Sequence, residues 1–133
     1  MGPPPNSFLL KEADLRGAHL QGKDLSYADL QWAFLQEAHL EGTIFTYAHL
    51  QGAHLQGAHL QGAHLEKATL LFAHLKEANL SESHLEGANL TGAILHRNVD
   101  LTGVDLTGTI LTGVDLEGII LSDKQRSQIK RNK

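Results

Sequence analysis

Leucine recurs at every fifth position along almost the whole chain. The series runs from Leu10 to Leu95 with one phenylalanine, Phe45, in register; after one extra residue it resumes at Leu101 and continues to Leu121. These are 23 apolar centres, of which 22 are leucine. A helix would need apolar spacings of three and four, and a lone strand would alternate with a period of two. The period of five favours a coiled chain instead, in which each short extended side holds one centre.

The residues around each centre repeat as well. Two positions before the centre, 14 of the 23 units have alanine, and two positions after it 12 units have glycine. The unit reads Ala-(His/Asp/Asn)-Leu-x-Gly, most clearly over residues 48–65. Glycine after the centre supplies the positive φ of a tight corner. We predict that leucine and alanine face inward, because only a small residue fits beside leucine in a narrow bore, and that the other positions face outward.

This unit, in 23 tandem copies over residues 8–123, resembles the pentapeptide repeat family, whose consensus is Ala-(Asp/Asn)-Leu-x-x. The resemblance implies an all-β fold, a right-handed quadrilateral β-solenoid with four units per coil. Residues 20 apart then stack, and the chain makes about six coils. The predicted core includes Leu10, Leu15, Leu20, Leu25, Leu30, Phe45, Leu50, Leu101 and Leu121.

The chain divides into three parts on this reading. Residues 1–7 form an N-terminal extension, residues 8–123 form the solenoid with a one-residue insertion near 96–98, and residues 124–133 form a basic C-terminal helix and tail. The last five units have β-branched residues or threonine in place of alanine. Because such residues favour strands, we expect the rear of the rod to be the more regular β-structure.

The ends of such a rod need caps, since an open end exposes both a β edge and the core. At the front, Phe8 takes the first inward position, and we expect its ring to plug the first coil. At the back, Ser122 and Gln125 fit a capping box. This motif predicts a short helix from about Asp123 to Ile129, laid over the last coil.

The charge is divided unevenly along the chain. Residues 1–123 contain all 15 acids and six bases, a net charge of −9, and the last ten residues contain the other five bases. An acidic body argues against nucleic-acid binding. The chain has no cysteine, no apolar run long enough to span a membrane and no secretory signal pattern. We therefore expect a cytoplasmic protein without disulfides or membrane contacts.

Eight of the nine histidines lie one position before a centre, which predicts stacked columns on the outside of the coil. Imidazoles one rung apart offer nitrogen ligands to a metal ion, but parallel rings do not converge, and we predict no metal site and no cofactor. The alternative is that histidine replaces the Asp or Asn of the consensus as a polar exposed residue. Whether the columns bind metal or sense pH stays open here. The predicted columns are His19/His39/His59, His54/His74 and His64/His84.

Apolar residues also occupy outward positions on a surface otherwise rich in Gln, Glu and Gly. With 20 residues per coil, Tyr27 stacks on Tyr47, and Trp32 shares a column with Phe72. Such residues predict a contact surface. The alternative is local shielding, in which a large side chain lies over a neighbouring corner that lacks glycine. The candidate interaction surface consists of Tyr27, Trp32, Phe34, Tyr47, Leu71 and Phe72.

Catalytic motifs are missing from the chain. It contains no nucleophile elbow, phosphate loop or HExxH sequence, and the repeat distributes its His, Asp and Ser residues around the coil instead of gathering them in a cleft. We predict no catalytic residues, no cofactor-binding residues and no enzyme activity.

Three interpretations of the function remain. The leading one is a rigid scaffold for an unidentified protein partner, with a homodimer through a terminal coil as a further expectation. The resemblance implies an alternative, because one branch of the family mimics B-DNA and binds DNA gyrase. The charge of −9 fits this branch, whereas the histidine-rich outward position and the basic tail count against it. The third interpretation is a structural filler without a partner.

Overall fold

Parallel β-bridges join residues 20 positions apart in the computed structural model, which describes residues 8–96 and 98–132. Leu9 pairs with Asp29, and Asp29 pairs in turn with His49. After the insertion the spacing becomes 21, as between Asn79 and Asp100. The predicted stacking is confirmed, and the ladder continues past the extra residue as far as Ile110.

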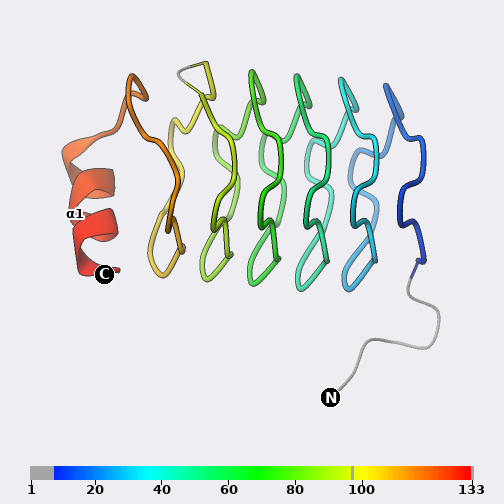
Figure 1. Ribbon diagram of the computed structural model, residues 1–133, viewed down its shortest axis with the longest axis horizontal. Coiled ribbons are helices and arrows are strands. Elements are labelled where there is room, and N and C mark those ends of the chain that lie inside the picture. Colours follow the sequence, from blue (N-terminus) through cyan, green and yellow to red (C-terminus); the bar gives the residue numbers. More distant parts are fainter. Residues whose placement is uncertain (1–7, 97, 133) are drawn as a thin grey trace.

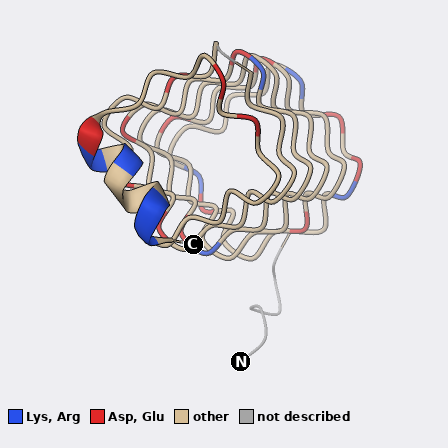
Figure 2. Cartoon of the chain, turned by 60° about the vertical axis from the view of Figure 1, so that its left-hand side comes forward, with Lys and Arg blue, Asp and Glu red and all other residues tan. Residues whose placement is uncertain are grey.

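The bridged residues form four columns around the rod, which Figure 2 shows obliquely from one end. We number them in chain order as sides 1 to 4. Each bridge is a single residue pair, so no extended strand forms among the described residues. Side 1 is Leu9, Asp29, His49, Thr69, Asn89 and Ile110; side 2 is Asp14, Phe34, His54, His74 and Ile94; side 3 is His19, His39, His59, Asn79 and Asp100; side 4 is Asp24, Ile44, His64, His84 and Asp105.

The corners between the sides turn through a residue with positive φ, two positions after each centre from Leu10 to Leu90 and from Leu101 to Leu116. Twelve glycines adopt this conformation, as predicted, but so do larger residues such as Trp32 (φ 60°) and Phe72 (φ 59°). The left-handed conformation costs a non-glycine residue about 1–2 kcal/mol. Its N–H bonds to the next coil, as the Trp32 N–H does to the Gln51 carbonyl at 2.9 Å. The ladder therefore imposes the turn on whatever residue stands there.

Leucine and alanine fill the bore of the rod. Of the predicted core residues, Leu25, Leu30, Phe45, Leu50 and Leu101 are at most 5% exposed. The centres of the outermost coils are partly buried, because a coil covers them from one side alone; these are Leu10, Leu15, Leu20, Leu111, Leu116 and Leu121.

The first coil leaves an apolar opening at its end. The opening measures about 370 Å³, and Phe8, Leu10, Leu15, Leu20 and Lys23 are among the residues that line it. Phe8 is 52% exposed and lines the opening, so it does not plug the coil as we expected. The predicted N-terminal extension, residues 1–7, and the extra residue near Arg97 lie outside the described residues.

The rear of the rod is not the more regular β-structure. Bridges reach as far as Ile110, and residues 111–122 take part in none. An opening of about 240 Å³, lined by residues 92–96 with Gly113, Asp115 and Glu117, follows the insertion. The prediction from β-branched residues was wrong because bridging depends on close approach of the neighbouring coil, which local strand propensity does not provide.

The chain ends in helix α1, Asp123–Arg131, which lies across the end of the last coil (Figure 1). The Ser122 hydroxyl accepts the Gln125 N–H at 3.1 Å, and the Gln125 side-chain oxygen accepts the Ser122 N–H at 2.9 Å. This capping box starts the helix at the expected residue, and the helix extends two residues beyond Ile129. In the described part of the chain, no helix is long and apolar enough to cross a bilayer.

Gln125 also bonds the open edge of the last full coil. Its side-chain N–H₂ donates to the carbonyls of Leu101 and Val104, at 2.8 and 3.0 Å. Inside the rod the carbonyl two positions before a centre, the equivalent of Val104, accepts a backbone N–H of the next coil, as Ala18 does from His39. The Leu101 carbonyl also accepts the Val104 N–H within its own coil. The amide therefore replaces the ladder where the ladder stops.

Gln128 and Asn132 continue this replacement along α1. Gln128 accepts the Leu106 N–H at 2.9 Å, and Asn132 accepts the Gly108 N–H at 3.1 Å. Asn132 also donates to the Thr109 carbonyl at 3.0 Å. Two amide side chains of α1 and that of its C-cap residue, Asn132, thus close the β edge at the end of side 4.

We predict that Gln125→Ala lowers the free energy of unfolding by about 1–3 kcal/mol, because it leaves the Val104 carbonyl at the covered edge without a donor and removes one of the two donors of the Leu101 carbonyl. Urea unfolding followed by circular dichroism measures the change. Ser127→Ala, an exposed position on the same helix, is the matched control and should change the stability by less than about 0.5 kcal/mol. Equal effects of the two substitutions would contradict the capping role.

Candidate interaction surface

Asp and Asn residues on the four sides hold the backbone that follows them. The Asp24 carboxylate accepts the Ser26 N–H at 3.0 Å, and the Asn79 side chain accepts the Ser81 N–H at 2.9 Å. The bonds from the Ser26 hydroxyl and N–H lower the pKa of Asp24. Among the described residues, no histidine in the same position accepts such a bond. Histidine therefore does not take over the structural role of the Asp or Asn that it replaces.

The histidines form parallel stacks along the rod, and the predicted columns are confirmed. On side 3 the ring centroids of His19 and His39 are 4.5 Å apart, and those of His39 and His59 are 4.8 Å apart. The stacks on side 2 and side 4 have spacings of 5.1 Å and 4.5 Å. The ladder brings the imidazoles of successive coils face to face.

The side 2 stack begins with an aromatic ring instead of an imidazole. Phe34 lies parallel to His54 with their centroids 4.8 Å apart, and His74 follows on the other side of His54. Burial lowers the pKa of His54, and the nearby charge of His74 lowers it further. Protonation of His54 is therefore disfavoured in the folded protein.

Three histidines have a glutamate two residues further along, and the two side chains approach each other. The distance from the histidine Nδ1 to the carboxylate Oε2 is 3.5 Å for His64 and Glu66. It is 3.9 Å for His84 and Glu86, and 4.0 Å for the pair His39–Glu41. The sequence analysis missed these pairs because it followed the histidine columns alone; the signal was the His-Leu-Glu triplet.

The predicted interaction surface divides between two corners of the rod. Tyr27 and Tyr47 stack at the corner between sides 4 and 1, with ring centroids 5.2 Å apart. Trp32 and Phe72 belong to the next corner, between sides 1 and 2. Phe34 and Ile94 lie beside that corner on side 2, and the sequence analysis did not single out Ile94. The apolar corner is defined here as Trp32, Phe34, Leu71, Phe72 and Ile94.

Trp32 and Phe72 cover glycines in the following coil. The indole lies against Gly52, so close that a Cβ at position 52 would overlap it, and Phe72 lies against Gly92 in the same way. Trp32 and Phe72 therefore shield corners that have glycine, where a Cβ would leave the ring no room, and not corners that lack it as the alternative had it. Tyr27 differs, because it stacks on Tyr47, a corner without glycine. Trp32 and Phe72 remain 47% and 57% exposed.

A model of the pentapeptide repeats matches residues 24–62, 58–97 and 96–123. The chain belongs to the pentapeptide repeat family. A pentapeptide repeat protein from the thylakoid lumen of Arabidopsis thaliana is 33% identical, with a TM-score of 0.70 over 88% of this chain and 77% of that one. Comparison with curated proteins finds no significant match.

Two further solved structures are similar in fold. HetL, a pentapeptide repeat protein involved in heterocyst differentiation regulation in the cyanobacterium Nostoc, is 28% identical, with a TM-score of 0.54 over 90% of this chain and 77% of its own. QnrB1, a plasmid-mediated fluoroquinolone resistance protein, is 21% identical, with a TM-score of 0.42 over 89% of this chain and 82% of its own. At that identity and score, the likeness to QnrB1 shows nothing beyond the repeat fold.

Alanine substitutions at two corner glycines, Gly52 and Gly62, distinguish the cost of displacing Trp32 from the cost of backbone strain. Gly62→Ala should cost about 1–2 kcal/mol, because Gly62 has φ +68° and open space around its Cα. Gly52→Ala should cost about 1 kcal/mol more, since it also displaces the indole. Chemical unfolding gives the two values, and the fluorescence of Trp32, the single tryptophan, should shift for Gly52→Ala alone. In a Trp32→Ala background the excess cost of Gly52→Ala should disappear; its persistence would contradict the contact.

Acid should destabilise this pentapeptide repeat protein through the protonation of His54. The pKa of His54 is lowered in the folded state, so its contribution to stability is complete above the ordinary value of about 6.5 and is lost as the pH falls through the folded-state pKa. We expect a lower melting temperature at about pH 5 than at about pH 8, and a smaller difference for His54→Asn. His49→Asn is the control, because its side 1 neighbours are Asp29 and Thr69. The same pH difference in His54→Asn and the unaltered chain would rule out this cause.

Proposed function

We propose that this pentapeptide repeat protein is a non-enzymatic scaffold that binds a protein partner through the apolar corner. The observation that carries the proposal is the half-exposed pair Trp32 and Phe72, two coils apart on one corner and flanked on side 2 by Phe34 and Ile94. Aromatic side chains in such positions are typical anchors of protein interfaces. A right-handed solenoid of about six coils would present them on a rigid surface.

The packing of these rings supports a role in binding. Trp32 and Phe72 each lie against a glycine of the following coil, Gly52 or Gly92, and about half of the surface of each residue stays exposed. Their positive φ gives no further support, because glutamate, lysine and tyrosine adopt it at the same position of other units. An aromatic ring that stays half exposed on a rigid surface is available for contact with another molecule.

Members of the pentapeptide repeat family are generally non-enzymatic, which supports a scaffold over a catalyst. The location that we propose is the cytosol, the compartment that the sequence favours. The similar Arabidopsis protein comes from the thylakoid lumen, so cell fractionation is the test of this point.

The DNA-mimic alternative has less support. A mimic of B-DNA needs its carboxylates on one face, but Asp29, Asp14, Asp100 and Asp24 lie on sides 1, 2, 3 and 4 in turn. Figure 2 likewise shows acidic residues around the whole rod. The likeness to QnrB1 supplies no argument for gyrase binding, and a DNA supercoiling assay with gyrase would test this alternative directly.

Affinity capture from a cell lysate, with the unaltered chain and two double variants as baits, tests the scaffold proposal. We expect one partner to bind the unaltered chain and to bind Trp32→Ala/Phe72→Ala at least about tenfold more weakly, since aromatic anchors contribute most of the energy of an interface. Tyr27→Ala/Tyr47→Ala, at the other aromatic corner, is the matched control and should retain the partner.

Two other results would change the proposal. Equal recovery by all three baits would mean that the rings of the apolar corner serve local packing. Recovery of a second copy of the chain by every bait would support the expected homodimer through a terminal coil, for which the apolar opening beside Leu10 and Leu15 is the candidate surface.

A further inference from the structure

Side 4 contains two His-Leu-Glu units in successive coils. His64 and His84 form a β-bridge, and the Leu65 N–H donates to the His84 carbonyl at 2.8 Å. Each histidine has its own glutamate beside it, Glu66 or Glu86. The third His-Leu-Glu unit, at residues 39–41, has Gln21 and Gln61 at the glutamate position of the adjacent coils. Side 4 is therefore the place where two such pairs lie directly one above the other.

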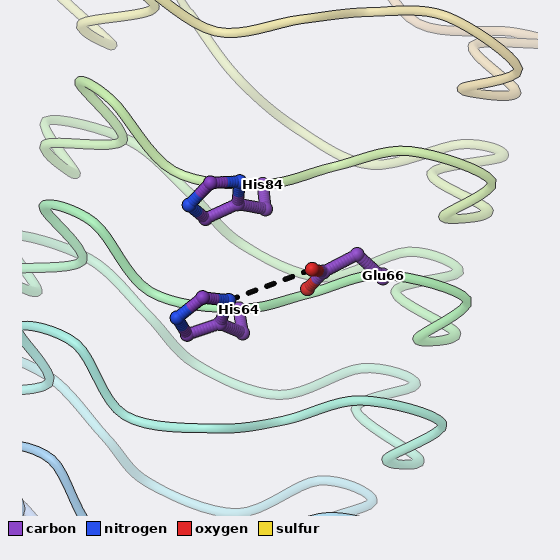
Figure 3. A group of neighbouring side chains, drawn as sticks. All are labelled: His64, Glu66 and His84. Carbon is purple, nitrogen blue, oxygen red and sulfur yellow. Dashed lines mark hydrogen bonds and ion pairs between the residues drawn. The ribbon is translucent and has the colours of Figure 1, made fainter.

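The side chains of this cluster bring three metal-binding atoms together. One atom each from His64, Glu66 and His84 lies within 4.8 Å of the other two, and Figure 3 shows the carboxylate of Glu66 directed toward the imidazoles. Two imidazole nitrogens and a carboxylate oxygen are a ligand set typical of Zn²⁺ and of similar divalent transition metals. Glu86, next to His84, supplies a fourth candidate ligand.

The two glutamates carry an unsatisfied group that points to a cation. The Oε1 atoms of Glu66 and Glu86 are buried, and neither has a hydrogen-bond partner among the residues that the structure describes. The same atom is buried without a partner in Glu41, which has Gln21 and Gln61 in the adjacent coils, and it belongs to a neutral amide in Gln36, Gln51, Gln56 and Gln61. A partly desolvated carboxylate costs more free energy than an amide unless a positive charge balances it. Two of them in adjacent coils make a bound cation favourable.

The surroundings confine the cluster to these two coils. On one side of it, side 4 continues with Ile44, which offers no ligand. On the other side, Asp105 already accepts the Thr107 N–H and the Gln128 amide at 2.9 Å each. Lys67 extends over Gly87 at the adjoining corner, so it contributes one nearby positive charge. The stack on side 2 differs, because Gln56 and Lys76 take the places of the two glutamates.

We propose that His64, Glu66 and His84, with Glu86 beside them, form a binding site for one divalent transition-metal ion such as Zn²⁺. The rings are parallel within 1°, with centroids 4.5 Å apart, so their lone pairs do not converge as they stand. Tetrahedral Zn²⁺ needs nitrogen atoms about 3.3 Å apart at Zn–N distances of about 2.0–2.1 Å. The histidine side chains are 41% and 44% exposed, which leaves them free to rotate toward the ion while the backbone ladder stays in place.

Calorimetric titration of the chelator-treated full chain with ZnCl₂ at about pH 7.5 tests the site. We expect one Zn²⁺ per chain, and His84→Asn and Glu66→Gln should each weaken binding by at least about tenfold. Both replacements are residues that the repeat itself uses, as in Asn79 and Gln61, so the fold should tolerate them. The matched control His54→Asn removes a histidine from the side 2 stack and should leave the affinity within about twofold of the unaltered chain.

A second readout follows the ring rotation. Nuclear magnetic resonance of the histidine side chains should show Zn²⁺-dependent shifts for His64 and His84 and none for His19. The proposal is overturned if no saturable binding occurs. It is equally overturned if His54→Asn weakens binding as much as His84→Asn, since Zn²⁺ would then be an adventitious ion held by exposed imidazoles in general.

Discussion

A left-handed backbone turn in almost every five-residue unit is the constraint on which the rest of the rod depends. It closes the unit, and the N–H of the turn residue bonds to the adjacent coil, as the Tyr27 N–H does to the Thr46 carbonyl. Glycine adopts this turn without strain, whereas tyrosine, tryptophan and glutamate adopt it because the ladder of inter-coil hydrogen bonds outweighs the cost. The same turn sets the bore of the coil, and the bore accepts leucine beside alanine.

Because the coils stack in register, a side chain that recurs at one position of the unit forms a column along the rod. A residue before the centre meets its equivalent about 4.5–5.1 Å away in the next coil, so one histidine per unit becomes a stack of imidazoles. Asp and Asn in that position accept the backbone N–H two residues later. Among the described residues, histidine in that position does not accept this bond, and it adds a titratable ring to the surface. The surface of this pentapeptide repeat protein thus departs from the consensus wherever histidine replaces Asp or Asn.

The two ends of the rod differ in how the unpaired backbone groups of the terminal coil are covered. At the C-terminal end, amide side chains of α1 and Asn132 reproduce the hydrogen bonds of a further coil along side 4. At the other end, the described residues leave an apolar opening beside Leu10 and Leu15. Amides suit this purpose because one side chain both donates and accepts, as a strand does, without offering an edge for continued pairing.

The sequence by itself determined the period, the inward residues, the corner glycines and the capping box of α1, because each follows from one unit or from residues three or four apart. It also predicted which residues stack, since a constant 20-residue coil makes that a matter of counting. Only the tertiary structure decided that Glu66 lies beside His64 and that Trp32 lies on Gly52. It also decided that Phe8 lines the opening of the first coil and that residues 111–122 form no bridges. These depend on side-chain rotation and on the fit between coils, and residues 20 positions apart in the sequence carry no local signal of either.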